Sequence, residues 1–293
     1  MPVSANLTVY ELPPSRYERV RPLFASDRYD EPFRDEVFEG KLTFPVFADD
    51  PDNPTAAMIC HPFEFYLGGA VSPALRMFCK DAPEEPGAFQ RFYGFATAGA
   101  AWKDALLADT PLTVIERRNF KWPMDKPAPD WQAKLPDGAQ LVWMNRAMAE
   151  RADRELDEHI SGQWGGYDNY ERYGAGFCLL MDGRLTSVAY ALAASNRHLN
   201  IGVKTAAGFR RQGLASIVCA ALIEHALQRG LQPAWCSDAL NHPSCELALR
   251  LGFEEDMSFV EIGPGWGNHL VLSRGLWSRG ETRADGVTVW QRA

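Results

Sequence analysis

A strand, a glycine turn and a helix follow one another in the C-terminal half of this chain. The apolar run Leu199–Thr205 predicts the strand, Arg210–Ala215 predicts the turn, and Leu214–Arg229 predicts the helix. The first amides of a helix have no intrahelical partner, and its dipole places about half a positive charge at that end. Gly213 has no side chain, so an anion can approach the backbone. The feature predicts an α/β fold with a pyrophosphate-type site at the helix start.

The glycine turn resembles the acyl-CoA motif of the GNAT N-acetyltransferase superfamily, Arg/Gln-x-x-Gly-x-Gly/Ala. Arg210, Gly213 and Ala215 fill its three defined positions. The superfamily's second motif is an Asn, a small residue three positions later, a helix and a closing Gly-Phe. The residues that match this second motif are Asn241, Ser244, Gly252 and Phe253. Two motifs in the right order indicate a GNAT fold; a chance basic helix start in another α/β protein is the alternative.

The elements expected from residue 141 onward follow the GNAT order, β-α-α-β-β-β-α-β-α-β. Strands are expected at 141–144, 177–181, 184–194, 199–205, 232–237 and 259–262. Helices are expected at 147–160 and 214–229, as a short piece within 167–173, and from Pro243 to Gly252. Asp182-Gly183 is a hairpin turn signal. The expected fold class is therefore α/β, with a GNAT acyl-CoA N-acyltransferase fold in the C-terminal half.

A proline-rich segment, Lys121–Asp130, divides the chain in the sequence, because its prolines cannot continue a helix or a central strand. We expect an N-terminal α/β domain at 1–130 and a GNAT acetyl-CoA-binding domain with a C-terminal extension at 131–293. Strands at 42–47, 56–66 and 112–115 and a helix at 95–107 are expected before the boundary. This first domain lacks a glycine turn like that at Gly213. We expect it to be a degenerate GNAT-like half that shapes the acceptor pocket or forms a homodimer interface.

This layout resembles the two-part bacterial GNATs related to zwittermicin-resistance acetyltransferases. Gly230–Trp235 and Asp238–Asn241 are close to that family's Gly-Leu-x-Pro-x-Trp and Asp-Ala-x-Asn, with Cys236 and Ser237 as extra residues between them. The resemblance implies an acetyl-CoA-dependent N-acetyltransferase for a primary amine of a small molecule, antibiotic-like or polyamine-like. A non-catalytic acyl-CoA-binding or sensor protein is the alternative.

The resemblance also implies where acetyl-CoA binds. The strand of Val203 and Thr205 would splay from its neighbour and pair through its backbone with the pantetheine arm, and the amides of Gln212–Ser216 would take the pyrophosphate. The implied cofactor-binding residues are Val203, Thr205, Arg210, Arg211, Gln212, Gly213, Leu214, Ala215, Ser216, Asn241 and Ser244. A capping or helix-start role is the alternative for Asn241 and Ser244.

The acid and base of many GNATs are missing here. The strand that usually carries a Glu offers Asn200, Gly202 and Lys204, and the usual Tyr position holds Ala248. Asp238, at a strand end, is the expected catalytic replacement, either taking a proton or anchoring an ammonium group; a turn or cap role is the alternative. Three tyrosines of the expected acceptor loop fit core or surface positions equally: Tyr167, Tyr170 and Tyr173.

Composition limits the partners. A net charge of −8 argues against nucleic-acid binding and suits a cationic amine. No stretch has the apolar length of a membrane span, and Met1–Tyr10 is no signal peptide. The six cysteines include no Cys-x-x-Cys pair, which favours a reduced, cytoplasmic protein. Cys236, His242 and Cys245 fit no standard zinc module, so no metal is expected. Gly263–Gly267 is expected to be a loop, because no helix-forming run follows it.

Overall fold

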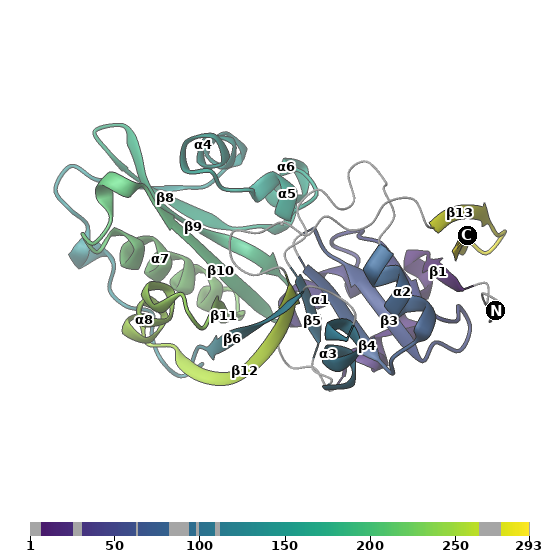
Figure 1. Cartoon of the computed structure of the whole chain (residues 1–293). Helices are drawn as coiled ribbons and strands as arrows, with labels where there is room; N and C mark the ends of the chain where they lie inside the picture. Colours follow the sequence, from purple (N-terminus) through teal and green to yellow (C-terminus); the bar gives the residue numbers. More distant parts are fainter. Residues whose placement is uncertain are drawn as a thin grey trace. The chain divides into compact units, whose positions relative to one another are not determined.

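The computed structural model describes residues 7–25, 31–62, 64–81, 94–97, 100–108, 112–263 and 277–292. The chain forms two compact units (Figure 1). Unit 1 comprises 1–29, 43–116 and 259–293, and unit 2 comprises 30–42 and 117–258. The position between residues 130 and 131, expected as a boundary, lies inside unit 2. Most of the expected glycine-rich loop, residues 264–267, lies outside the described residues.

Unit 1 is built on a sheet with the strand order β13-β14-β1-β2-β3-β4-β5. Its strands are β1 (Thr8–Leu12), β2 (Val46–Ala48), β3 (Ala56–Cys60), β4 (Glu64–Gly69), β5 (Gly94–Thr97), β13 (Trp277–Thr282) and β14 (Thr288–Arg292). Its helices include α2 (Pro73–Asp81), α3 (Ala100–Leu107) and the 3-10 turns η1 (Pro14–Arg19) and η2 (Arg21–Phe24). Only the pair β4–β5 is parallel among these neighbours. Aromatic side chains fill the core, with the rings of Phe47 and Phe78 4.6 Å apart.

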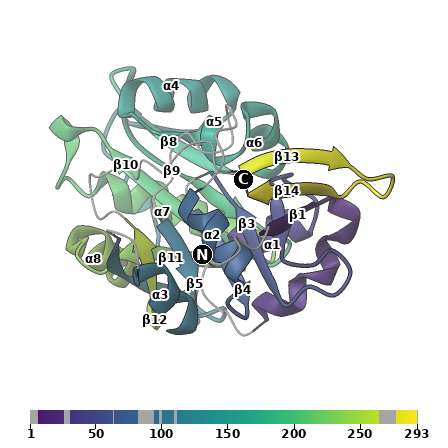
Figure 2. The ribbon, with the colours of Figure 1, turned by 45° about the vertical axis from the view of Figure 1, so that its right-hand side comes forward.

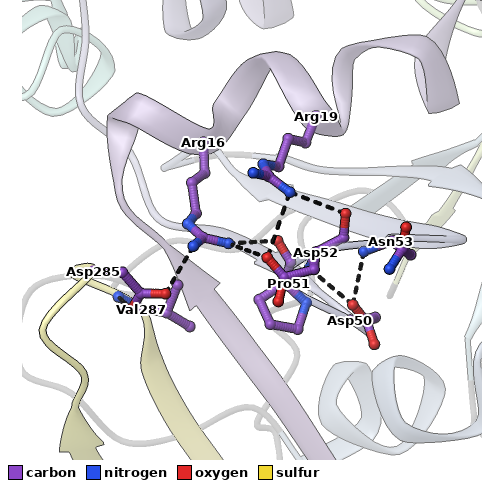
Figure 3. Close-up of polar contacts among 8 residues, drawn as sticks. All are labelled: Arg16, Arg19, Asp50, Pro51, Asp52, Asn53, Asp285 and Val287. Carbon is purple, nitrogen blue, oxygen red and sulfur yellow. Dashed lines mark hydrogen bonds and ion pairs between the residues drawn. The ribbon is translucent and has the colours of Figure 1, made fainter.

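One arginine joins three segments of unit 1 (Figure 3). The Arg16 guanidinium in η1 donates to Pro51 O and Asp52 Oδ1, both at 2.9 Å, and to Asp285 Oδ2 at 2.7 Å. Arg19 donates to Asp52 O at 3.0 Å. Asp50 accepts from the next amides of the same turn, which lowers its pKa. Charge-assisted bonds of this kind hold η1 against the β2–β3 and β13–β14 turns.

Unit 2 has the strand order β6-β11-β10-β9-β8-β7. Its strands are β6 (Thr113–Lys121, from Arg117 on), β7 (Gln140–Trp143), β8 (Gly176–Met181), β9 (Arg184–Ala194), β10 (His198–Thr205), β11 (Gln232–Asp238) and the first part of β12 (Glu254–Gly263). Its helices are α1 (Glu31–Phe38), α4 (Arg146–Leu156), α5 (Ile160–Gln163), α6 (Tyr167–Tyr173), α7 (Leu214–Gln228) and α8 (His242–Leu251), with the turns η3 (Gln132–Lys134) and η4 (Ala207–Phe209). Helices α4 to α6 cover one face of the sheet and α7 covers the other (Figures 1 and 2).

The predicted helix at 147–160 is wrong in one respect, because it is two helices. Helix α4 ends at Leu156, and Asp157 turns the chain with a φ of 54°. Asp153 then accepts hydrogen bonds from the amides of Ile160 and Ser161 at 2.8 and 3.1 Å, which starts α5. The remaining elements expected between 141 and 252 agree with the structure to within two residues at each end, apart from the predicted loop with a short helix, which is helical throughout as α6.

The predictions before residue 120 need more correction. The predicted strand 56–66 is two strands that pair antiparallel, with His61 and Pro62 between them; proline cannot donate to a central ladder. The predicted helix 95–107 starts as strand β5, and only Ala100–Leu107 is helical. The strand at 42–47 is confined to β2, while those at 112–115 and 259–262 extend into the longer β6 and β12. None of the helices in the described part of the chain is long and apolar enough to cross a membrane.

Candidate functional site

Strands β10 and β11 part from each other halfway along. They pair in parallel at His198–Gln232, Leu199–Pro233 and Asn200–Ala234. Beyond that point the residues of β10 pair with β9 on one side, and those of β11 pair with β6 on the other. In the registers of the described strands, the facing edges of 201–205 and 235–238 are therefore not joined. Backbone amides and carbonyls along these edges can pair with an extended ligand.

Asn200 lies at the last pair before the strands part. Its side chain is 2% exposed, and its Oδ1 has no hydrogen-bond partner among the described residues. Buried polar atoms in proteins are nearly always paired, so an orphan oxygen here indicates a missing partner. An N–H group of a ligand lying between the strands would satisfy it.

The glycine turn follows β10 directly and is built for close approach. Gly213 is the N-cap of α7, has a φ of 80°, and makes no side-chain cap hydrogen bond. A Cβ at this position would meet nothing within 4 Å. Arg211 adopts a φ of 62°, which non-glycine residues rarely do. The amides of Gln212 to Ala215 have no acceptor among the described residues, whereas the Ser216 amide donates to Gly213 O at 3.0 Å. They lie at the positive end of a fifteen-residue helix.

Two side chains of the glycine turn stabilise it through hydrogen bonds to nearby backbone carbonyls. Arg210 Nε donates to Thr205 O at 3.2 Å, and Gln212 Nε2 donates to Gly208 O at 3.4 Å. Arg211 is exposed, whereas Leu214 is buried and can offer a ligand only its amide. The half-buried residues that continue the helix are Ala215 and Ser216. The half-buried strand residues Val203 and Thr205 lie on the part of β10 that pairs with β9 and no longer with β11.

Asp238 ends β11 at the parted edge and is 2% exposed. Its Oδ1 accepts a hydrogen bond from Leu240 N at 2.7 Å. The structure therefore shows the turn role for this residue. Its catalytic role stays a prediction.

The second motif builds the start of α8. Asn241 is the N-cap, with its Oδ1 accepting from Ser244 N at 3.4 Å, and Pro243 occupies the first turn. Ser244 Oγ accepts from Trp235 Nε1 at 3.1 Å. The capping and helix-start roles are shown for Asn241 and Ser244. A contact of either with pantetheine stays a prediction.

The tyrosines of the expected acceptor loop take different positions on α6. Tyr170 is in the core beside Trp164, and burial raises its pKa well above the ordinary value. Tyr167 donates to Asp153 Oδ2 at 2.8 Å; partial burial and this bond raise its pKa to about 12. Tyr173 is half-buried. Tyr167 and Tyr170 are therefore weaker acids than an ordinary tyrosine.

Glu158, in the connection between α4 and α5, is a carboxylate that no sequence motif indicates. Tyr190 of β9 donates its hydroxyl hydrogen to Glu158 Oε2, and Lys204 Nζ of β10 lies 3.2 Å from Glu158 Oε1. Burial raises the pKa of Tyr190, and the neighbouring carboxylate adds to this effect. Nothing in the sequence around Glu158 could have located it, because its partners lie 32 and 46 residues away.

A cavity of about 290 Å³ lies beside α7. The residues that line it are Pro129, Asp130, Trp131, Lys134, Ser216, Ala220, Arg250 and Leu251. Trp131 is held there by a 2.9 Å hydrogen bond from its Nε1 to Glu224 Oε2. The cavity thus places one aromatic ring and two cations beside Ser216, one turn into the helix that Gly213 starts.

Comparisons with known proteins point to one family and one fold. The family model of GNAT acetyltransferases matches residues 27–260. No curated protein matches the chain. A GCN5-related N-acetyltransferase-like protein from Streptococcus suis has a similar structure, with a TM-score of 0.70 and 22% identity, over 85% of this chain and 98% of that one.

Two further solved structures share the fold at lower identity. A tandem GNAT protein from the clavulanic acid biosynthesis pathway has a TM-score of 0.57 at 14% identity, over 89% of this chain and 99% of that one. A GCN5-related N-acetyltransferase from Sphaerobacter thermophilus has a TM-score of 0.55 at 14% identity, over 92% and 99%. The predicted GNAT fold is confirmed, and family and fold support acyl transfer. The chain belongs to the GNAT acetyltransferase family.

Proposed function

We propose that this protein is an acetyl-CoA-dependent N-acetyltransferase that acts on a primary amine of a small molecule. The parting of β10 and β11, followed by the amides of Gln212 to Ala215 that have no acceptor among the described residues, carries the proposal. An acyl-CoA needs both features, because its pantetheine arm has amides to pair and its pyrophosphate needs donors. The buried, unpaired Oδ1 of Asn200 supports a ligand in the same place.

In this proposal the backbone at Val203 and Thr205 pairs with pantetheine, and the amides from Gln212 to Ala215 hold the pyrophosphate, with Ser216 beside them. A strand amide near Val203 polarises the thioester carbonyl, as an oxyanion-type donor does. Acetyl transfer then needs a neutral amine and a group that takes its proton. Asp238 supplies one carboxylate at the end of β11.

The cavity beside α7 offers a place for the nucleotide end of the donor. Lys134 and Arg250 bring two positive charges to it, Asp130 brings one negative charge, and Trp131 brings an aromatic ring. A nucleobase stacks on aromatic rings, and a phosphate pairs with cations. We therefore assign the 3′-phosphate-bearing adenosine to this cavity.

The acceptor is proposed to be a small cationic amine. The net charge of −8 favours the approach of cations, although only as a long-range effect. The missing strand Glu and the Ala248 at the usual Tyr position favour the second candidate, a protein that binds acyl-CoA without turnover.

Calorimetric titration with acetyl-CoA tests the donor, and CoA-thiol release with spermidine, kanamycin and glucosamine tests the reaction. Micromolar binding at one site per chain with CoA release supports the enzyme. Binding without release from any amine supports the sensor. If acetyl-CoA does not bind even when amines are present, both candidates are wrong.

A further inference from the structure

Glu158 lies beside the part of β10 that no longer pairs with β11. Residues directly opposite each other on neighbouring strands share a face, and so do alternate residues of one strand. Gly202 pairs with Tyr190, so Gly202, Lys204 and Tyr190 face the same side. From the α4–α5 connection, Glu158 contacts the side chains of Tyr190 and Lys204. Its carboxylate therefore lies on the α4–α6 side of the strand along which the thioester is proposed to lie.

The Glu158 carboxylate already binds one ammonium group, that of Lys204. Its side chain is 12% exposed, and Lys204 Nζ, 3.2 Å from Oε1, belongs to a side chain that is 38% exposed. The ion pair thus joins a nearly buried anion to a cation that reaches solvent. A partly desolvated carboxylate binds a cation more strongly than an exposed one does. Tyr190 holds the other oxygen, so the carboxylate keeps its place if Lys204 moves away.

We propose that Glu158 receives the ammonium group of the acceptor and takes its proton, and that Lys204 occupies the carboxylate when no acceptor is bound. This inference rests on the proposed function and names the residue that deprotonates the substrate. Asp238 is less suited, because it is more deeply buried, at 2% exposed against 12% for the Glu158 side chain, and it holds its own turn through the Leu240 amide.

The proton and bond changes balance. The ammonium gives one proton to the Glu158 carboxylate, which becomes a carboxylic acid. The neutral nitrogen forms the C–N bond to the thioester carbon, and the C–S bond breaks with its electron pair going to sulfur. The second proton leaves nitrogen for the thiolate, giving CoA thiol, and Glu158 returns its proton to solvent.

The test compares Glu158→Gln, Glu158→Asp and the control Glu155→Gln by CoA release with the amine that the parent protein turns over best among spermidine, kanamycin and glucosamine. Glu155 is a nearby α4 carboxylate whose partners, Arg151 at 2.8 Å and Arg154, belong to the same helix. A positioned base contributes about 100- to 10,000-fold. We expect Glu158→Gln to lower kcat/KM at least about 100-fold, Glu158→Asp to recover part of it, and Glu155→Gln to match the parent. The Kd for acetyl-CoA should stay the same in all three.

Lys204→Gln separates this role from a merely structural ion pair. Without the competing cation, Glu158 is open to the acceptor, so the KM for the amine should fall several-fold while acetyl-CoA binding is unchanged. A structural pair predicts the opposite, equal losses in Lys204→Gln and Glu158→Gln. Full turnover by Glu158→Gln, or a raised KM in a folded Lys204→Gln, overturns the inference alone. Absence of turnover by the parent with every amine overturns the proposed enzyme and this inference with it.

Discussion

Gly213 is central to the proposed donor site, because it caps α7 and has open space where a side chain would lie. We expect Gly213→Glu to place a carboxylate where the pyrophosphate binds and to weaken acetyl-CoA binding about 100-fold, or roughly 2.7 kcal/mol. Open space around the position means that the variant still folds, at a backbone cost of about 1–2 kcal/mol. Calorimetric titration measures the change.

Gly230 provides the matched control for backbone strain. It follows the other end of α7, has a φ of 69°, and a Cβ there also meets nothing within 4 Å. Gly230→Glu therefore adds the same side chain to a similar backbone conformation, far along the helix from Gly213. Its acetyl-CoA affinity should equal that of the parent. Equal weakening in both variants would mean that strain, and not the anion site, explains the loss.

Two substitutions separate the structural role of Asp238 in its turn from the role of its negative charge. Asp238→Asn keeps an oxygen to accept from Leu240 N and removes the negative charge, whereas Asp238→Ala removes both. If Glu158 takes the proton, the Asn variant should keep turnover within about threefold and the Ala variant should lose about 1 kcal/mol of stability. Steady-state CoA release and urea unfolding measure the two effects. A large loss of turnover in the Asn variant with unchanged stability would return the catalytic role to Asp238.

At the scale of elements, the cavity lies between the turn η3 and the helices α7 and α8. Its charged residues lead to a prediction about binding of the donor. Lys134→Glu and Arg250→Glu should each weaken CoA binding about tenfold, because each reverses a charge that is proposed to face the 3′-phosphate. The affinity for dephospho-CoA, which lacks that phosphate, should hardly change. Titrations with the two ligands give this ratio directly, and equal losses for both would place the 3′-phosphate elsewhere.

Local signals explain which elements the sequence predicts well. Asp182-Gly183, Gly213 and Gly252 end or turn the chain through their own φ angles of 50–113°, so a window of a few residues contains the information. The turn and the two motif helices were therefore predictable. The pairing of Arg117–Lys121 with Ala234–Asp238 depends on contacts more than 100 residues apart, and no local pattern marks it. The same holds for Glu158, whose role is visible only once β9 and β10 are in register.

At the scale of the whole molecule, the chain alternates between its units, and unit 2 takes in residues 30–42. This segment holds the β9–β10 turn through three side chains. Glu36 Oε2 accepts from Ala194 N at 3.1 Å, Lys41 Nζ donates to Ala194 O at 2.9 Å, and Glu39 accepts from Asn196 N at 2.8 Å. Residues 131–293 alone would lack both this support and β6. Sequence position therefore misleads about which residues belong to the site-bearing unit.

Glu36 makes the stability of this arrangement depend on pH. Its side chain is fully buried; burial raises its pKa well above the ordinary value, although the Ala194 amide and Lys41 oppose the rise. In the unfolded chain Glu36 loses its proton near pH 4.5, while the folded protein keeps it to a higher pH. Folding therefore binds a proton above pH 4.5, and the contribution of Glu36 to stability falls as the pH rises toward the folded pKa.

Glu36→Gln keeps an oxygen that can accept from the Ala194 amide and removes the ionisation. We expect the variant to gain stability relative to the parent as the pH rises from 5 to 8. Over this range Glu36 of the unfolded parent is ionised, so the free energy of unfolding of the parent falls, whereas the glutamine of the variant has no such pH dependence. Urea unfolding of both proteins at the two pH values measures the difference. A constant difference across this range would mean that Glu36 keeps an ordinary pKa, so that the segment 30–42 holds the β9–β10 turn with an ionised carboxylate.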